Sequence, residues 1–171
     1  MAGDSPSERK PNLAFVLARA SIFGTAVAGT FLVLLPWLLL RMSTARWNLG
    51  LAPRVIGVVL MALGYLVAVW CAIGFVVEGW GTPAPYDPPR RLVTGHLYER
   101  VRNPIYVGGT IILLGEVLVF RSPALLAFAA AMWLIWHLVV VLYEEPALRR
   151  RFGAAYEDYR RRVPRWIPRL W

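Results

Sequence analysis

Two polar segments that border long apolar ones contain the residues whose types and spacing could do chemistry. The first runs from Arg91 to Gly109 and passes from basic and aromatic side chains directly into an apolar stretch. The second is the pair Glu144–Glu145, at the point where the last long apolar stretch gives way to a basic tail. A helix beginning at Asn103–Pro104 directs free N–H groups and the positive end of its dipole towards an anionic group. With two carboxylates on the other segment, the pattern favours a zwitterionic ligand held between them.

A purely structural interpretation of the same residues stays open. Arg100 and Arg102 could anchor the chain at a membrane surface, as positive flanks of membrane spans commonly do. The pair Glu144–Glu145 could form ion pairs with arginines of the tail. The residue types alone do not separate this interpretation from a binding site.

The composition is that of a membrane protein. Of the 171 residues 58% are hydrophobic and only 17% are charged, and the mean hydropathy is +0.52, which is too apolar for a soluble domain of this size. The net charge of +9 comes from basic clusters beside apolar runs, which favours lipid headgroups as partners and not nucleic acid. The single cysteine, Cys71, excludes an intrachain disulfide and a cysteine zinc site, so we expect no metal.

We expect an all-α membrane protein with four transmembrane helices, a single membrane domain over residues 13–171 and a disordered cytoplasmic N-terminus over residues 1–12. Crossing the hydrocarbon layer takes about 20 helical residues. The glycines of the second span, Gly57 and Gly64 among them, allow close approach of another helix. The expected spans are residues 13–40, 55–77, 104–120 and 123–142.

The polar segments between and after the spans determine the expected topology. Only Arg121 and Ser122 separate the last two spans, so these form a helical hairpin. Four of the 19 basic residues fall on the opposite side of the membrane from the termini, so the termini and the connection over residues 78–103 are expected to be cytoplasmic. Apolar residues at three- and four-residue spacing predict that the tail, residues 146–171, is an amphipathic helix on the membrane surface. The four residues on the other side are Arg41, Arg46, Arg54 and Arg121.

Three motifs in the C-terminal half, from about Arg90 to Pro168, carry a resemblance. They resemble the isoprenylcysteine carboxyl methyltransferase family and its phospholipid N-methyltransferase relatives, and their joint spacing is highly specific. The motifs are Gly95-x-Leu97-Tyr98-x-x-Val101-Arg102-Asn103-Pro104-x-Tyr106-x-Gly108, then Glu144-Glu145-Pro146-x-Leu148, then Phe152-Gly153-x-x-Tyr156-x-x-Tyr159-x-x-x-Val163-Pro164-Arg165-x-Ile167-Pro168.

The resemblance implies S-adenosylmethionine as cofactor and a lipophilic methyl acceptor. Asn103 stands where the family usually has His, and an amide forms hydrogen bonds but cannot carry a charge or act as a base. Val140 occupies the position at which the eukaryotic carboxyl methyltransferases place an arginine for the substrate carboxylate. The cofactor-binding residues that the resemblance implies are Leu92, Val93, Tyr98, Arg102, Asn103, Pro104, Ile105, Tyr106, Gly108, Glu144 and Glu145.

Two more ionisable residues lie inside the predicted spans. His137 precedes Glu144 by about two helical turns on the same face, which makes it a candidate for contact with the acceptor's polar group or for a general base. Hydrogen bonding within the bundle is the alternative role for such a histidine. His137 and Glu144 are therefore the predicted catalytic residues, and Glu116, deeper in its span, is expected to form a structural hydrogen bond.

The sequence thus predicts an S-adenosylmethionine-dependent methyltransferase that acts on a lipophilic small molecule or lipid. Two alternatives stay open: an NADPH-dependent membrane reductase of the sterol reductase type, and a non-catalytic family member that binds a lipid or a partner protein. The preference for Arg over Lys, with many Ala and Val residues, indicates a bacterial source and hence the cytoplasmic (inner) membrane.

Overall fold

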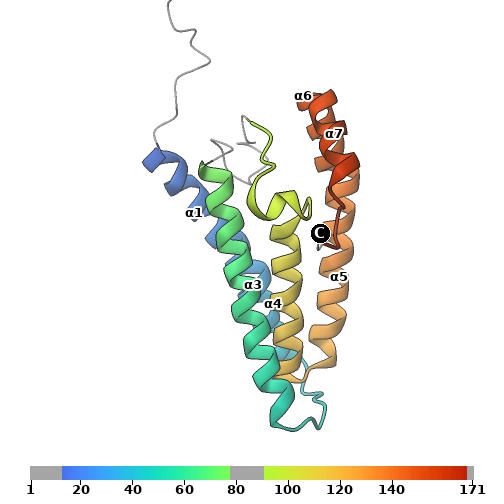
Figure 1. The fold of residues 1–171 in the computed structure, drawn as a ribbon. Helices are drawn as coiled ribbons and strands as arrows, with labels where there is room; N and C mark the ends of the chain where they lie inside the picture. The colour runs from blue at the N-terminus through green and yellow to red at the C-terminus, as the bar shows by residue number, and fades with distance from the viewer. Residues whose placement is uncertain (1–12, 78–90, 169–171) are drawn as a thin grey trace, which may run out of the picture.

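The computed structural model describes residues 13–77 and 91–168, and every regular element in these ranges is helical (Figure 1). Two of the elements, η2 and η4, are π-helical turns that continue neighbouring α-helices, and η3 is a 3₁₀-helix. The elements are α1 (Leu13–Gly29), η2 (Thr30–Leu34), α2 (Leu35–Met42), α3 (Leu51–Val77), η3 (His96–Glu99), α4 (Pro104–Phe120), α5 (Pro123–Val139), η4 (Val140–Glu144), α6 (Glu145–Phe152) and α7 (Ala154–Arg162).

Three continuous helical segments of the described chain are long and apolar enough to cross a membrane. They are Ser21–Met42, Leu51–Gly74 and Pro123–Phe152. The fourth expected span, α4, has the predicted bounds but only 17 residues. The second and fourth spans are longer than expected, because α3 begins at Leu51 and α5 runs on through η4 into α6.

Helices α3 and α4 pack backbone against backbone. A Cβ atom built on Gly57 would lie 2.6 Å from the carbonyl oxygen of Gly115, and one built on Gly64 would lie 2.6 Å from that of Gly108. The prediction that Gly57 and Gly64 allow another helix to approach is confirmed. This contact fixes α4, the helix that begins at the candidate site, against the longest described α-helix of the chain (Figure 1).

Helices α4 and α5 form the predicted hairpin. Arg121 ends α4 in the left-handed backbone conformation (φ 53°), and Ser122 caps α5 by accepting a hydrogen bond from the Leu125 amide. Arg121 also donates from Nη1 to the Leu49 carbonyl oxygen at 2.8 Å, which holds the loop before α3 against the hairpin. The hairpin core consists of Leu113, Val117, Leu125, Ala129 and Met132, packed against Leu32, Leu39, Leu40, Phe128 and Trp136.

The tail differs from the single amphipathic helix expected over residues 146–171. Helix α6 ends at Gly153, whose φ of 52° and ψ of −125° turn the chain before α7, and the backbone is extended again at Val163. The apolar residues that suggested one long helix pack onto the protein: Tyr156, Tyr159 and Val163 are buried in a cluster that Leu92, among others, completes. The periodicity therefore reflects burial against the segment that follows residue 90.

Replacing Gly153 by Ala is expected to destabilise the protein by about 1 kcal/mol or more, because a side chain disfavours this backbone conformation even where space is free. Thermal unfolding in detergent should therefore shift to lower temperature. Gly24→Ala, at an exposed helical position with nothing within 4 Å of the added atom, serves as the control. An equal midpoint for both variants would show that the turn carries no strain.

Candidate functional site

The two polar segments meet at one end of the helical bundle. The start of α4, the end of α5 with η4 and α6, and the chain that follows α7 lie together there (Figure 1). The Arg102 amide donates to the Pro164 carbonyl oxygen at 2.9 Å, so the stretch 163–167, here called the C-terminal strap, crosses the beginning of α4. The predicted proximity of Arg91–Gly109 and Glu144–Glu145 is confirmed by the contacts below.

The π-helical turn η4 directs the two glutamates to different partners. A π turn holds one residue more than an α turn, so residues eight apart, and not seven, share a face across it. Trp136 and Glu144 both contact Tyr106: the Trp136 and Tyr106 ring centroids are 5.7 Å apart, and the Tyr106 hydroxyl donates to the Glu144 carboxylate. His137 and Glu145 contact the C-terminal strap instead. The expectation that His137 shares a face with Glu144 assumed an unbroken α-helix, and the extra residue removes that alignment.

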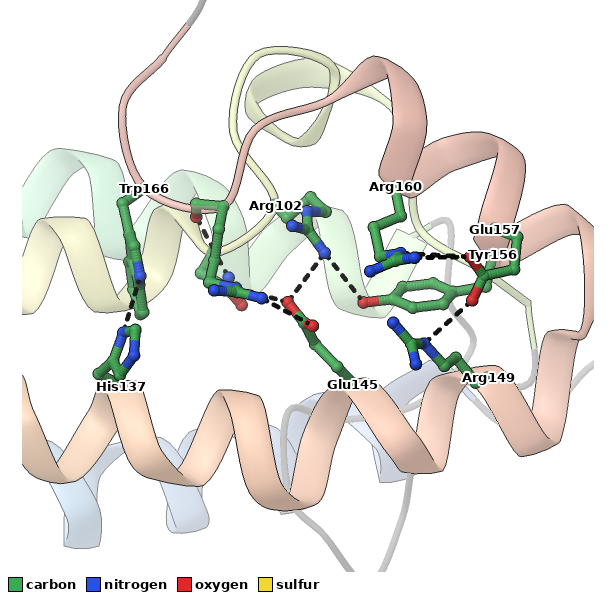
Figure 2. Close-up of polar contacts among 10 residues, drawn as sticks. Arg102, His137, Glu145, Arg149, Tyr156, Glu157, Arg160 and Trp166 are labelled. Carbon is green, nitrogen blue, oxygen red and sulfur yellow. Dashed lines mark hydrogen bonds and ion pairs between the residues drawn. The ribbon is translucent and has the colours of Figure 1, made fainter.

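Glu145 lies between two arginines. Arg102 donates from Nη1 to Oε1 at 2.8 Å, and Arg165 donates from Nε to Oε1 at 2.7 Å and from Nη2 to Oε2 at 3.0 Å (Figure 2). Glu145 is only 5% exposed, and its hydrogen bond raises the pKa of Arg165. The structural interpretation, in which a glutamate pairs with a tail arginine, is thus confirmed for Glu145.

Glu144 is the carboxylate that remains open. It is half-buried, and its Oε2 atom has no hydrogen-bond partner among the described residues, while Oε1 accepts from Tyr106. The Tyr106 hydroxyl fixes the orientation of the carboxylate, and Trp136 lies beside the tyrosine ring. This pair offers one oriented negative charge next to two aromatic faces, a suitable environment for a cationic group.

Helix α4 begins at Pro104, as the sequence predicts. Asn103 occupies the capping position but makes no capping bond; its Nδ2 donates to the Arg165 carbonyl oxygen at 3.2 Å. The side chain that stands in for the family's histidine therefore holds the C-terminal strap. The N–H groups in the first turn of α4 remain directed at this end of the bundle.

Several other residues implied in cofactor binding have packing roles. Val93 and Tyr98 are buried with Cys71, and Ile105 packs against the same cluster. Tyr159 donates to the Tyr98 carbonyl oxygen at 2.8 Å, and burial raises the pKa of Tyr159, which keeps this donor protonated.

Two more of these residues support the site from its edges. Leu92 contacts the buried tyrosines of α7. Gly108 faces Gly64 of α3, so its missing side chain serves helix packing.

His137 is part of an aromatic cluster that the sequence interpretation missed. The Trp166 Nε1 atom donates to His137 Nδ1 at 3.1 Å (Figure 2). Trp133, one turn before His137, stacks on the imidazole with ring centroids 5.4 Å apart and an interplanar angle of 22°. The four-residue spacing of Trp133 and His137 was the available signal; the contact with Trp166 depends on the course of the strap.

Glu116 lies well inside the hairpin, apart from these residues in the sequence. It is 5% exposed, and its Oε2 atom has no hydrogen-bond partner among the described residues. The structure therefore gives no partner at Oε2 for the structural hydrogen bond expected from the sequence.

Comparisons with known proteins agree with these motifs. The sequence profile of the family described as "Phospholipid methyltransferase" matches residues 53–155, more than half of the chain. The chain is 38% identical over 74 residues to "Methanethiol S-methyltransferase 2" of Bradyrhizobium diazoefficiens, which covers 43% of this chain and 27% of that protein. It is 38% identical over 78 residues to "Protein-S-isoprenylcysteine O-methyltransferase" of Schizosaccharomyces pombe, which covers 45% and 33%.

A third relative matches over a longer stretch. "Nickel-cobalt-cadmium resistance protein NccN" of Alcaligenes xylosoxydans xylosoxydans is 30% identical over 115 residues, which covers 67% of this chain and 48% of that protein. Across these three relatives, the chain therefore spans between about a quarter and a half of each relative's length.

Proposed function

The chain belongs to the phospholipid methyltransferase family of membrane proteins, and we propose that it transfers a methyl group from S-adenosylmethionine to a lipophilic small molecule or lipid. The observation that carries the proposal is the open carboxylate of Glu144, oriented by Tyr106 and flanked by Trp136. It lies at the end of the bundle where α4 begins, so a negative charge and a helix N-terminus belong to one site. A zwitterion with an additional cationic centre matches that combination.

The residues present fit this cofactor. The first turn of α4 would bind the cofactor's carboxylate through backbone N–H groups, and Glu144 would bind a cationic group. Tyr106 and Trp136 supply aromatic faces, which stabilise cationic groups at close range. The bound cofactor supplies an activated methyl group; the protein's own contribution is to orient the two reactants and to exclude water.

Glu145, Arg102 and Asn103 have supporting roles in this proposal. They hold the C-terminal strap across the site through the contacts of Arg165 and the Arg102 amide. The strap then forms one wall of the site, and Glu145 contributes to cofactor binding through its position.

The proposed topology has four spans, with α4 as the short one, and a cytoplasmic site. The support is the distribution of basic residues: Arg102, Arg149–Arg151 and Arg160–Arg162 all lie at the end of the bundle that holds the site. Arginine and lysine accumulate on the cytoplasmic side of membrane proteins. We place the protein in the bacterial cytoplasmic membrane on this basis.

Calorimetric titration of the detergent-solubilised protein with S-adenosylmethionine tests the proposal. We expect binding by the unaltered protein and an affinity about tenfold or more weaker for Glu144→Gln, because a hydrogen bond to a charged group contributes about 1.5–3 kcal/mol. Glu157→Gln, an acidic residue on the surface of α7, is the matched control and should bind normally. The amide oxygen that Glu144→Gln introduces can still accept from the Tyr106 hydroxyl, which preserves the local fold.

Other outcomes of the same experiment would contradict the proposal. Heat with NADPH and none with S-adenosylmethionine would indicate the reductase alternative. Cofactor binding without transfer of labelled methyl to any component of a total lipid extract would indicate a non-catalytic member of the family.

A further inference from the structure

A groove opens between α4 and α5 below the candidate site. It has a volume of about 240 Å³ and is lined by Thr110, Leu114, Leu126, Ala129, Ala130 and Trp133. Leu114, Leu126 and Trp133 are 41–44% exposed, so the groove is open along the outside of the hairpin, where an apolar helix pair faces lipid. The volume is below the roughly 300–1,000 Å³ of a site for a drug-sized molecule, which favours a slender occupant.

The groove walls favour a hydrocarbon. Its one polar lining residue, Thr110, already donates to the Tyr106 carbonyl oxygen at 2.9 Å. The floor residue Ala129 is 3% exposed and belongs to the hairpin core. An occupant therefore finds no polar partner along the groove among the described residues.

The site end of the groove is polar. Thr110 lies one turn from Tyr106, the partner of Glu144, and Trp133 stacks on His137. The indole nitrogen of Trp166 can only donate, so the His137 Nδ1 atom that accepts from it carries no proton. The imidazole is then neutral with its proton on Nε2, and Nε2 has no hydrogen-bond partner among the described residues. Figure 2 shows His137 and Trp166 in this contact.

We propose that the groove binds the single hydrocarbon chain of the methyl acceptor and that the Nε2–H group of His137 donates to the acceptor's anionic head, a thiolate or a carboxylate. This deepens the proposed function and rests on it. A chain in the groove and a head at His137 place the acceptor between the bilayer and the face of Glu144. An acyl chain of a bulk lipid, with no head bound at His137, is the competing occupant.

The acceptor class follows from the protonation of His137. A thiolate or carboxylate supplies its own electron pair to form the new bond to the methyl carbon. The bond between that carbon and the sulfonium sulfur breaks, and its electron pair stays on the cofactor's sulfur. No proton is removed in this step. An amine or a phenol needs a base, and both nitrogens of His137 are otherwise engaged, Nδ1 by Trp166 and Nε2 by its own proton.

The test uses two adjacent alanines of α5 that are both exposed. Ala130→Phe fills the groove, whereas Ala131→Phe adds the same ring outside it and is the matched control. Both proteins are titrated with S-adenosylmethionine first, then assayed with dodecanethiol, ethanethiol, dodecanoate and dodecylamine as acceptors.

We expect Ala130→Phe to lower kcat/KM for the dodecyl acceptor by about tenfold or more, as overfilling a packed site does. The rate with ethanethiol and the cofactor affinity should stay unchanged, and Ala131→Phe should behave as the unaltered protein. Equal effects of the two variants would overturn the groove and indicate a bulk lipid chain. Methylation of dodecylamine as efficient as that of the thiol and the carboxylate would overturn the acceptor class.

His137 variants separate a hydrogen-bond donor from a base. His137→Gln keeps an N–H donor, so it should retain most of the activity with dodecanethiol, whereas His137→Phe should lose it. The rise of rate with pH should follow ionisation of the thiol in the unaltered protein and in His137→Gln alike. Loss of activity in both variants, with a changed pH profile, would make His137 a base. Absence of cofactor binding would overturn the proposed function together with this inference; binding and lipid labelling without transfer to any single-chain thiol or carboxylate would overturn the inference alone.

Discussion

Replacing Glu145 by Gln is expected to lower the free energy of unfolding by about 3 kcal/mol. Breaking a buried ion pair by removing one partner typically costs about 3–5 kcal/mol, because the remaining charge is left uncompensated. Here two arginines lose their counter-charge at once. The Arg102 side chain is 10% exposed and cannot regain water, whereas that of Arg165 is 30% exposed and regains part of it, which places the effect at the lower end of this range.

Thermal unfolding in detergent, followed by helical circular dichroism, checks this prediction. Glu157→Gln is the control, since the Glu157 side chain is 38% exposed and its ion pairs are surface pairs, which contribute about 0–1 kcal/mol. The contrast with Glu144→Gln is equally informative, because we expect that variant to lose cofactor affinity at unchanged stability. Similar midpoints for the Glu145 and Glu157 variants would contradict a structural role for Glu145.

Gly64→Ala is expected to destabilise the protein by up to about 3 kcal/mol, the upper end of the cost of overpacking. The added carbon would lie 2.6 Å from the Gly108 carbonyl oxygen and 2.8 Å from the Ile112 side chain. A side chain can rotate away, but a helix backbone cannot, so α3 and α4 must separate. Because α4 carries Asn103 and Tyr106, the variant should also bind S-adenosylmethionine more weakly.

The comparison is with Gly24→Ala, where the same added methyl group meets nothing within 4 Å. At such a helical position alanine favours folding by about 0.5–1 kcal/mol. Opposite signs for the two substitutions are expected in thermal unfolding. A Gly64→Ala protein with unchanged unfolding and unchanged cofactor affinity would show that this close approach does not position the site.

The elements of the site could be predicted from the sequence, but their pairing could not. Asn103–Pro104 marks the start of α4 by local chemistry, and Arg121–Ser122 is too short for anything but a hairpin, so both predictions are confirmed. The fate of Glu145 depends on Arg165, 20 residues away, and nothing local indicates which of the tail arginines reaches it. The break at Gly153 was missed because the apolar spacing of the tail is compatible with both lipid and a protein partner.

The exchange of faces at the glutamate pair had a different origin. Sequence spacing is converted into helix faces with a constant 3.6 residues per turn, and η4 departs from that value over Val140–Glu144. No residue type in this stretch signals a π turn. The alignment of His137 with Glu144 was therefore the expected result of a rule that fails at this turn.

The extra residue of η4 also determines which changes of length the chain can absorb. Leu142 is 70% exposed, so its side chain is dispensable, but its place in the backbone count is not. Deleting it would restore a regular α-helix with all its hydrogen bonds, and every later residue would rotate by about 100° around the axis. Both glutamates would still be present, each opposite the wrong neighbours. Variants of this region drawn from relatives are therefore compatible only when they preserve the number of residues between Trp136 and Glu145, whatever their side chains.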